Sequence, residues 1–253
     1  MKAIILAAGR GTRLPVSARD IPKVMVDVAG KPVLQHQIDL LKKHEVHDIR
    51  VSLGVKAEAV IEYLKGKNIE YANAGAALGT AGNIRYALDS DTNEPFMVLN
   101  GDVLSDINLK EFQKTFSQSG ADFMLVAYYL NDVREYGHLD LEDTDMRNIK
   151  KVNAFLEKPK SETPISGFMN AGVYICRPER FLLLKKGGLY SMEKEIFPQL
   201  VREGKLYAYI HDGWWREMGT EERLAALREE LGAKHKNHTG STGVFGVYEK
   251  REA

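Results

Sequence analysis

The chain has 253 residues, and its 35 Lys and Arg balance its 35 Asp and Glu, which excludes a general attraction to nucleic acid or to a membrane surface. Its composition, 44% hydrophobic and 28% charged, is that of an ordinary globular protein, and its length suits one large domain. A single cysteine, Cys176, excludes an internal disulfide and indicates a reducing compartment. No segment approaches the ~20 apolar residues that span a bilayer, so we expect a cytoplasmic protein with neither a membrane nor a nucleic-acid partner.

The first half of the chain alternates strand and helix patterns. Short apolar runs predict strands, and apolar residues spaced three and four apart predict helices. Strands are expected at 3–6, 49–53, 69–71 and 96–99, and helices at 33–44, 57–64 and 82–88. This alternation predicts a parallel sheet with helices on both faces.

The second half is richer in strands. These are expected at 121–130, 137–141, 149–156, 169–176 and 206–210, with helices at 178–185, 192–201 and 221–231. From Gly232 the sequence becomes polar and contains several glycines, with a last β-like piece at 244–248. We therefore expect one domain over residues 1–231 and a polar C-terminal tail with a short strand over 232–253.

The loop from Leu6 to Leu14, LAAGRGTRL, follows the first strand and contains two glycines and two arginines. Glycine lets backbone amides approach an anion, and the planar guanidinium of arginine suits phosphate oxygens. Lys23 adds a further cation soon afterwards. A dinucleotide-binding loop of an NAD-dependent oxidoreductase needs glycine where Leu14 stands, and a Walker A loop needs Gly-Lys-Ser/Thr, so neither fits. The loop predicts a pocket for a polyphosphate.

This loop, together with Pro22-Lys23, resembles the signature of the sugar-1-phosphate nucleotidyltransferases. The likeness continues to about residue 231 through further motifs in the same order, namely LGTAG at 78–82, NGD at 100–102, YG at 136–137, FLEKP at 155–159, NAG at 170–172 and GT at 219–220. The resemblance implies a three-layer α/β/α Rossmann-like nucleotidyltransferase fold with a mixed, mostly parallel central sheet. It also implies a Mg²⁺-dependent enzyme that joins an NTP to a sugar 1-phosphate and releases pyrophosphate.

The resemblance places the nucleotide against the opening loop. Arg13 would face the phosphate oxygens that leave as pyrophosphate, and the compact charge of Lys23 would face the α-phosphate under attack. The nucleotide-binding residues that it implies are Leu6, Ala7, Ala8, Gly9, Gly11, Thr12, Arg13, Lys23, Gly79 and Thr80.

Two carboxylates are candidates for the metal. Asp102 follows an apolar strand, where the ligand sites of open α/β sheets lie, and Mg²⁺ prefers oxygen ligands. The matching aspartate binds the metal in the family. The second family carboxylate is usually Asp in Asp-x-Gly-Thr, and Glu217 stands there in this chain. Glu217 is one methylene longer and could still reach Mg²⁺, or it could form an ion pair with Arg216 instead.

The sugar phosphate is assigned through the resemblance alone. Lys158 would hold its phosphate, Glu157 would accept hydrogen bonds from sugar hydroxyls, and Asn170 and the backbone of Gly137 would add further contacts. The expected catalytic residues are Arg13, Lys23, Asp102 and Lys158. A phosphate monoester oxygen already carries negative charge, so the reaction requires no general base.

Substrate choice is the least determined property. Segments 190–198 and 205–213 are most similar to heptose 1-phosphate guanylyltransferases, with mannose-1-phosphate guanylyltransferases and N-acetylmuramate 1-phosphate uridylyltransferases close behind. GTP with a heptose or mannose 1-phosphate is therefore favoured. A uridylyltransferase or other NTP specificity, and a nucleotide-binding regulatory protein weakened at Glu217, stay open as alternatives, as does assembly into a homo-oligomer.

Overall fold

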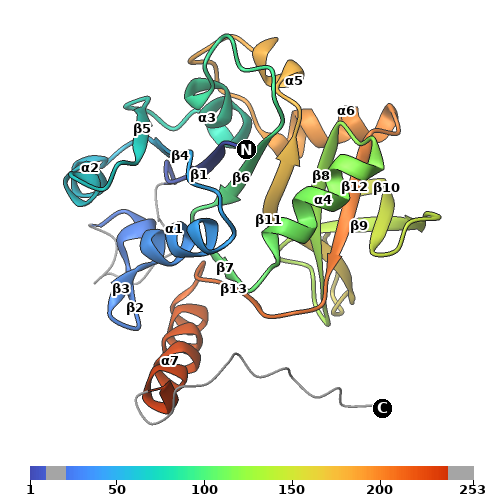
Figure 1. Cartoon of the computed structure of the whole chain (residues 1–253). Coiled ribbons are helices and arrows are strands. Elements are labelled where there is room, and N and C mark those ends of the chain that lie inside the picture. Colours follow the sequence, from blue (N-terminus) through green and yellow to red (C-terminus); the bar gives the residue numbers. More distant parts are fainter. Residues whose placement is uncertain (10–20, 239–253) are drawn as a thin grey trace.

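The computed structural model describes residues 1–9 and 21–238, with side chains up to residue 232 (Figure 1). Its strands are β1 Ala3–Leu6, β2 Asp27–Val28, β3 Lys31–Pro32, β4 Ile49–Leu53, β5 Glu70–Asn73, β6 Phe96–Asn100, β7 Val103–Ser105, β8 Phe123–Leu130, β9 Gly137–Asp143, β10 Ile149–Glu157, β11 Gly167–Cys176, β12 Leu206–His211 and β13 Trp215–Glu217. Its helices are η2 Lys23–Met25, α1 Val33–Lys43, α2 Glu58–Leu64, α3 Gly79–Ala87, α4 Leu109–Ser119, α5 Glu179–Leu182, η3 Met192–Ile196, α6 Phe197–Arg202 and α7 Glu221–His238.

A nine-stranded sheet forms the centre, in the order β5-β4-β1-β6-β11-β8-β12-β10-β9. The strands β5, β4, β1 and β6 pair in parallel, as the alternating first half predicts. β11 pairs antiparallel with both β6 and β8, and β10 pairs antiparallel with both β12 and β9. Seven of the nine strands thus run in one direction and β10 and β11 run against them, so the sheet is mixed, with parallel pairs along β5-β4-β1-β6 and between β12 and β8.

Helices cover both faces because the apolar residues of each strand alternate between two cores. Ile5 and Leu99 pack into a core that includes α1, α2 and α4, while Ile4 and Val98 pack into a core that includes α3, α5 and α6. Cys176 is fully buried in the second core, where burial raises the pKa of its thiol. The predicted three-layer α/β/α fold is confirmed.

Helix α4 was not expected from the sequence, although its signals are present. The Asn108 side chain accepts a hydrogen bond from the Glu111 amide at the helix N-terminus, and Gly120 ends the helix with φ 66°. Leu109, Phe112 and Phe116 form the buried stripe that packs it on the sheet.

Several predicted helices differ in extent; the helix expected at 178–185, for example, is the single turn Glu179–Leu182. The helix expected at 192–201 consists of a π-helical turn, η3, followed by α6, where Pro198 has no N–H to continue the hydrogen-bonding pattern. The helix expected to end at 231 continues as α7 to His238, across the expected domain boundary, and α7 projects from the domain below β7 and β13 (Figure 1). Residues 239–253, including the expected strand at 244–248, lie outside the described part of the chain.

Two short strands position the far end of the site. β7 follows the turn after β6 and pairs antiparallel with β13, so that Val103 lies opposite Glu217. The Met218 amide donates to the Asp102 carbonyl at 3.2 Å. The pairing therefore brings the two carboxylates that the sequence singles out, Asp102 and Glu217, to neighbouring positions.

Candidate active site

A cavity of about 310 Å³ opens at the carboxyl ends of β1 and β6. Ligand sites of open α/β sheets are commonly found at such strand ends. The cavity brings together many residues that the sequence predicts to bind a nucleotide, and they are Leu6, Ala7, Ala8, Gly9, Lys23, Gly79 and Thr80, with the predicted metal ligand Asp102 beside them. Gly11, Thr12 and Arg13 lie outside the described residues.

The turn after β6 is pressed against the end of β1. The Gly101 amide donates to the Leu6 carbonyl at 3.0 Å. A Cβ at residue 101 would lie 2.3 Å from that carbonyl oxygen and 2.6 Å from Val24 Cγ1. The turn therefore requires glycine, and it holds the next residue, Asp102, against η2.

Lys23 and Asp102 form an ion pair at the cavity wall. Lys23 Nζ donates to Asp102 Oδ2 at 3.0 Å, and the two side chains are 13% and 34% exposed. Within the part of the chain that the structure describes, Lys23 is the group that bonds this carboxylate. The pair keeps a largely buried lysine beside the cavity, where an incoming phosphate oxygen would share its ammonium with Asp102.

Thr80, at the start of α3, lines the cavity but uses its hydroxyl elsewhere. Thr80 Oγ1 donates to Glu193 Oε2 at 2.9 Å and accepts from the Met192 amide at 2.8 Å. Gly79, with φ 73°, packs so closely that a Cβ there would lie 2.3 Å from the Tyr190 carbonyl oxygen. The predicted nucleotide contacts of this motif thus depend on its backbone, while its side chain holds the 190–193 segment in place.

Asn170 is connected to the cavity through a buried tyrosine. Its Nδ2 donates to the Tyr174 hydroxyl at 2.9 Å, and its Oδ1 accepts from the Gly172 amide at 3.0 Å. Asn100, which lines the cavity, approaches the same hydroxyl at 3.5 Å. Tyr174 is fully buried, and burial raises the pKa of its hydroxyl. This hydroxyl was missed from the sequence; its signal is one polar group in the apolar run Gly172-Val-Tyr-Ile-Cys176.

Glu157, Lys158 and Gly137 lie together on two paired strands. Glu157, at the end of β10, is opposite Gly137 at the start of β9, and Lys158 Nζ lies 3.9 Å from Glu157 Oε1. Burial and the nearby Glu193 carboxylate raise the pKa of Glu157, and the cation of Lys158 opposes this shift. Because Glu193 also bonds Thr80, these residues are linked to the edge of the nucleotide cavity.

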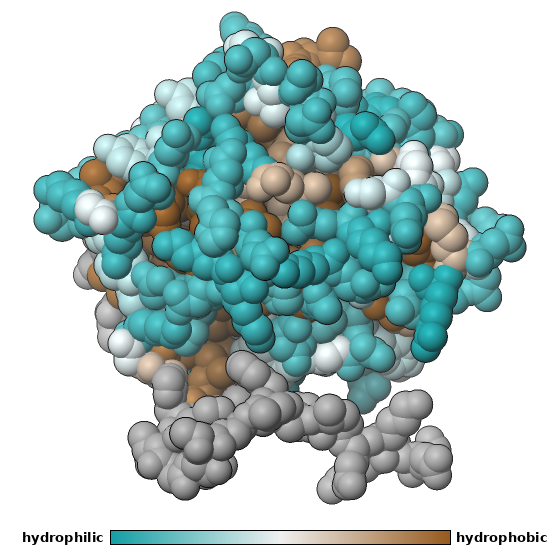
Figure 2. Space-filling view, in the orientation of Figure 1, coloured by the Kyte–Doolittle hydropathy of each residue, from teal (hydrophilic) through white to brown (hydrophobic). Residues whose placement is uncertain are grey.

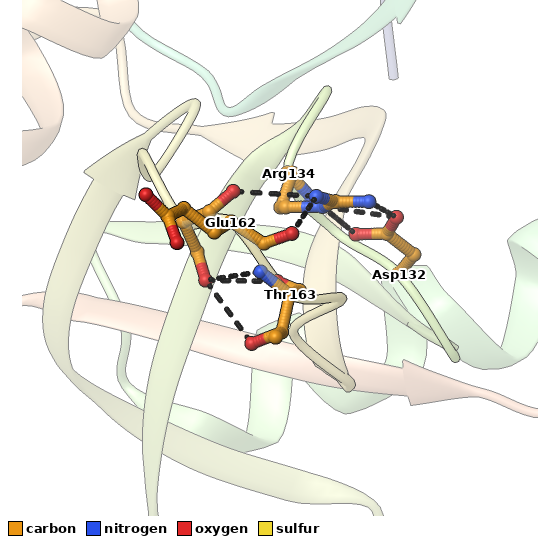
Figure 3. Close-up of polar contacts among 5 residues, drawn as sticks. Asp132, Arg134, Glu162 and Thr163 are labelled. Carbon is orange, nitrogen blue, oxygen red and sulfur yellow. Dashed lines mark hydrogen bonds and ion pairs between the residues drawn. The ribbon is translucent and has the colours of Figure 1, made fainter.

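The loop that follows Lys158 is held by an arginine (Figure 3). Arg134 makes a two-pronged contact with Asp132, with Nε to Oδ1 at 2.9 Å and Nη2 to Oδ2 at 2.7 Å. Its Nη1 donates to the carbonyls of Ser161 and Glu162 at 3.2 and 3.4 Å. The Arg134 hydrogen bonds lower the pKa of Asp132 to about 2, so this clamp stays charged across the physiological range.

Glu217 is 11% exposed and is surrounded by donors. Its Oε1 accepts from Arg223 Nη1 at 2.5 Å and from the Tyr136 hydroxyl at 3.1 Å, and its Oε2 accepts from the Gly219 amide. The alternative ion pair with Arg216 is wrong, because Arg216 binds Glu230 with Nε at 3.0 Å and Nη2 at 2.8 Å. Arg223 lies in the first turn of α7, six residues after Glu217, whereas Arg216 is adjacent to Glu217 in the sequence.

The sequence matches a known protein family. The model of the family described as "Nucleotidyl transferase" matches residues 2–234. The chain belongs to this nucleotidyl transferase family. The predicted family is therefore confirmed, and the match spans both the Lys23–Asp102 cavity and the Glu157–Lys158 strands.

Several named proteins are similar to this nucleotidyl transferase. Mannose-1-phosphate guanyltransferase of Saccharomyces cerevisiae is 34% identical over 227 residues, which are 87% of this chain and 61% of the yeast protein. Probable mannose-1-phosphate guanylyltransferase 2 of Oryza sativa is 32% identical over 98% of this chain and 70% of its own length. The crystal structure of HddC from Yersinia pseudotuberculosis complexed with GMP-PN has a TM-score of 0.76 and 29% identity, covering 91% of this chain and 99% of HddC.

The two predicted metal ligands, Asp102 and Glu217, differ in how well their surroundings suit a metal ion. Asp102 fits, since proteins often hold Mg²⁺ through one or two carboxylates together with substrate phosphates. Glu217 already accepts from three donors, and a metal beside it would adjoin the Arg223 cation. Within the described residues, no group of three or more His, Cys, Asp or Glu side chains is arranged to hold a metal. A metal role for Glu217 would require Arg223 to move away.

The face shown in Figure 2 is mostly hydrophilic, with apolar residues in small areas between polar ones. Of the helices in the described part of the nucleotidyl transferase, none has the length and apolarity needed to cross a membrane.

Proposed function

We propose that this chain transfers a nucleoside monophosphate from an NTP to a sugar 1-phosphate and releases pyrophosphate, with GTP and mannose or heptose 1-phosphate as the favoured substrates. The observation that carries the proposal is the Lys23–Asp102 pair in a glycine-walled cavity at the strand ends. The names of the yeast and rice relatives, and the GMP-PN in the HddC complex, support a guanine nucleotide.

In the proposed reaction, an oxygen of the sugar 1-phosphate attacks the α-phosphorus of the NTP. The new P–O bond forms as the bond from the α-phosphorus to the oxygen bridging the α- and β-phosphates breaks, and that oxygen leaves with the pyrophosphate. Lys23 would bind an α-phosphate oxygen and stabilise the negative charge in the transition state. The nucleophile is already an anion, so the site needs no side chain to remove a proton.

Asp102 is the group proposed to hold Mg²⁺. When bound, the ion would neutralise phosphate charge and reduce the repulsion between the two anionic substrates. One Asp102 oxygen has no partner among the described residues, and Lys23, at 3.0 Å from the other oxygen, holds the carboxylate beside the cavity.

The sugar 1-phosphate is proposed to bind along β9, β10 and β11. Lys158 would contact its phosphate, and Glu157, Asn170 and the Gly137 backbone its hydroxyls. A Cβ at residue 137 would lie 2.4 Å from the Phe155 ring, so the packing at this position favours glycine. Arg134 holds the loop after Lys158, which limits the positions open to the ammonium.

A second candidate is a nucleotide-binding regulatory protein of the same fold. The observation in its favour is the engagement of Glu217 by Arg223 and Tyr136, which takes one expected metal carboxylate out of use. Other NTP specificities, a cytoplasmic location and a homo-oligomer stay predictions.

A substrate panel tests the proposal. Pyrophosphate release is measured for each of the four NTPs with mannose, heptose, glucose and N-acetylmuramate 1-phosphates, with Mg²⁺ and with EDTA. We expect the highest rate with GTP, loss of turnover in EDTA, and a loss of at least about 100-fold in Lys23→Ala, because the transition-state charge loses its cation. Tight GTP binding without turnover for any pair would instead favour the regulatory protein.

A further inference from the structure

A buried glutamine lies behind the turn that carries Asp102. Gln37 belongs to the apolar stripe of α1, between Leu34 and Leu41, and is 1% exposed. Its Nε2 donates to the Asn100 carbonyl at 2.7 Å and to the Val103 carbonyl at 2.8 Å. Both N–H groups of one amide are therefore used on the main chain, and the two acceptors directly bracket Gly101-Asp102.

These hydrogen bonds add to those that tie the turn to β1. The Gly101 amide donates to the Leu6 carbonyl at 3.0 Å, and the Gln37 amide connects the end of β6 to the start of β7. With its backbone tied on both sides, Asp102 has little freedom to move relative to Lys23.

The turn also borders a second pocket, which is open to solvent, has a volume of about 250 Å³ and is lined by Gln37, Leu99, Val103, Leu104 and Trp214 among others. Where the turn faces this pocket it has fewer packed neighbours, so its hydrogen bonds contribute more to holding it in place.

The amide is retained at a cost. Gln37 Oε1 is buried and has no hydrogen-bond partner among the described residues. An unsatisfied buried acceptor destabilises a fold, and an apolar side chain of the same shape would avoid this penalty. The two donated hydrogen bonds are what glutamine adds over methionine at this position.

We propose that Gln37 is a positioning residue: it fixes the position of the Asn100–Val103 turn, and so keeps the Asp102 carboxylate beside Lys23 at the phosphate-binding cavity. This inference rests on the proposed function of that cavity. Gln37 touches no substrate itself, and its effect reaches the reaction through the two carbonyls. Small misplacements of a catalytic group cost large factors in rate, of the order of 100-fold for ~1 Å.

The test compares Gln37→Met with Ile38→Val. Methionine keeps the length of the side chain and removes both donors, whereas Ile38→Val removes one buried methyl group from the same helix without touching the turn. Hydrogen exchange of the amides at 101–104 is measured by mass spectrometry, together with kcat, the KM of GTP and the Tm. In Gln37→Met we expect exchange at these amides to rise about tenfold or more and kcat to fall about 10- to 100-fold, with the KM of GTP within about threefold. Ile38→Val should leave both properties within about twofold.

Unchanged exchange at 101–104 in Gln37→Met, or an equal loss of kcat in Ile38→Val at equal Tm, would overturn the positioning role. The exchange measurement requires no turnover. If no variant, including the parent protein, turns over any substrate pair while exchange still rises in Gln37→Met alone, the proposed function fails and the effect of Gln37 on the turn stands.

Discussion

The parallel half of the sheet and its antiparallel half hold their site residues in different ways. In the parallel half, Lys23 is 13% exposed, pairs with Asp102 at 3.0 Å and adjoins a turn that admits only glycine. In the antiparallel half, Lys158 is 50% exposed and lies 3.9 Å from Glu157. The Lys23–Asp102 pair is positioned by strand ends and tight backbone contacts, whereas Lys158 and Glu157 are more exposed side chains at the end of β10.

This difference separates two tasks. The parallel half holds its charges in place before a ligand arrives, which suits the stabilisation of a developing charge. The antiparallel half offers more exposed side chains, which suits the recognition of one sugar among several. Substitutions in the parallel half should therefore lower turnover, and those in the antiparallel half should weaken binding of one substrate.

The largest effect is expected at Asp102. Asp102→Ala should reduce kcat/KM by at least about 1000-fold, which is about 4 kcal/mol of transition-state stabilisation, because it removes the proposed metal carboxylate and unpairs Lys23. Asp102→Asn keeps the shape without the charge and should lose nearly as much. Pyrophosphate release measures both; near-parental activity in Asp102→Asn would show that the charge is not needed.

Lys158 tests the antiparallel half. Lys158→Ala should raise the KM of the sugar 1-phosphate about 10- to 100-fold and leave the KM of the NTP within about twofold, because a charge-assisted hydrogen bond to one substrate is lost. Lys160→Ala, two residues further along the same loop, is the matched control and should change neither value. Equal increases in both KM values would mean that the two halves do not divide the substrates in this way.

The contacts of Glu217 with Arg223 and Tyr136 are tested by substituting Arg223. Arg223→Met leaves Glu217 buried without its cation, so the free energy of unfolding should fall by about 1–2 kcal/mol in urea denaturation. Arg228→Met, which removes one exposed hydrogen bond to the Asp27 carbonyl from the same helix, should cost less than about 0.5 kcal/mol. A larger loss in Arg228→Met would contradict the assigned role of the Glu217 contacts.

The smallest effect concerns the pH dependence of Glu157. Burial and Glu193 raise the pKa of Glu157, so the folded state disfavours the ionised form of this carboxyl. The protonated form therefore stabilises the fold at low pH, and this contribution is lost as the pH rises through the raised pKa. Glu157→Gln should therefore have a Tm about 1–2 °C above the parent at pH 7.5 and no advantage at pH 4. Thermal denaturation at both pH values decides; an advantage confined to pH 4 would reverse the sign of the shift.

Much of the fold was predictable because it depends on local patterns. β1 and β4 were placed with their observed bounds, since β1 is a short apolar run and β4 alternates apolar and polar residues. Helix α4 was missed, although Asn108 and Gly120 mark its two ends. The pairing of β7 with β13 could not be predicted, because strands of three residues carry too little pattern to be recognised.

The site shows the same limit. Motifs placed Lys23 and Asp102 at one cavity because strand ends of a parallel sheet meet at one edge. The partners of Glu217 were not accessible in this way, since Tyr136 is 81 positions away and nothing in the two motifs indicates that their side chains meet. Gln37 had a signal, a polar residue within an apolar helical stripe, but its two acceptors depend on how α1 packs against the turn.

The place of β11 between β6 and β8 has a consequence for the order in which the chain is made. β6 is complete at residue 100, but the strand that covers its open edge ends only at Cys176. A ribosome adding residues from the N-terminus must therefore produce 76 more before that edge is fully covered, and an uncovered edge is a place where other chains can pair. Nascent chains stopped short of Gly167 should thus be the ones that chaperones retain, while those extended beyond Cys176 can close the sheet.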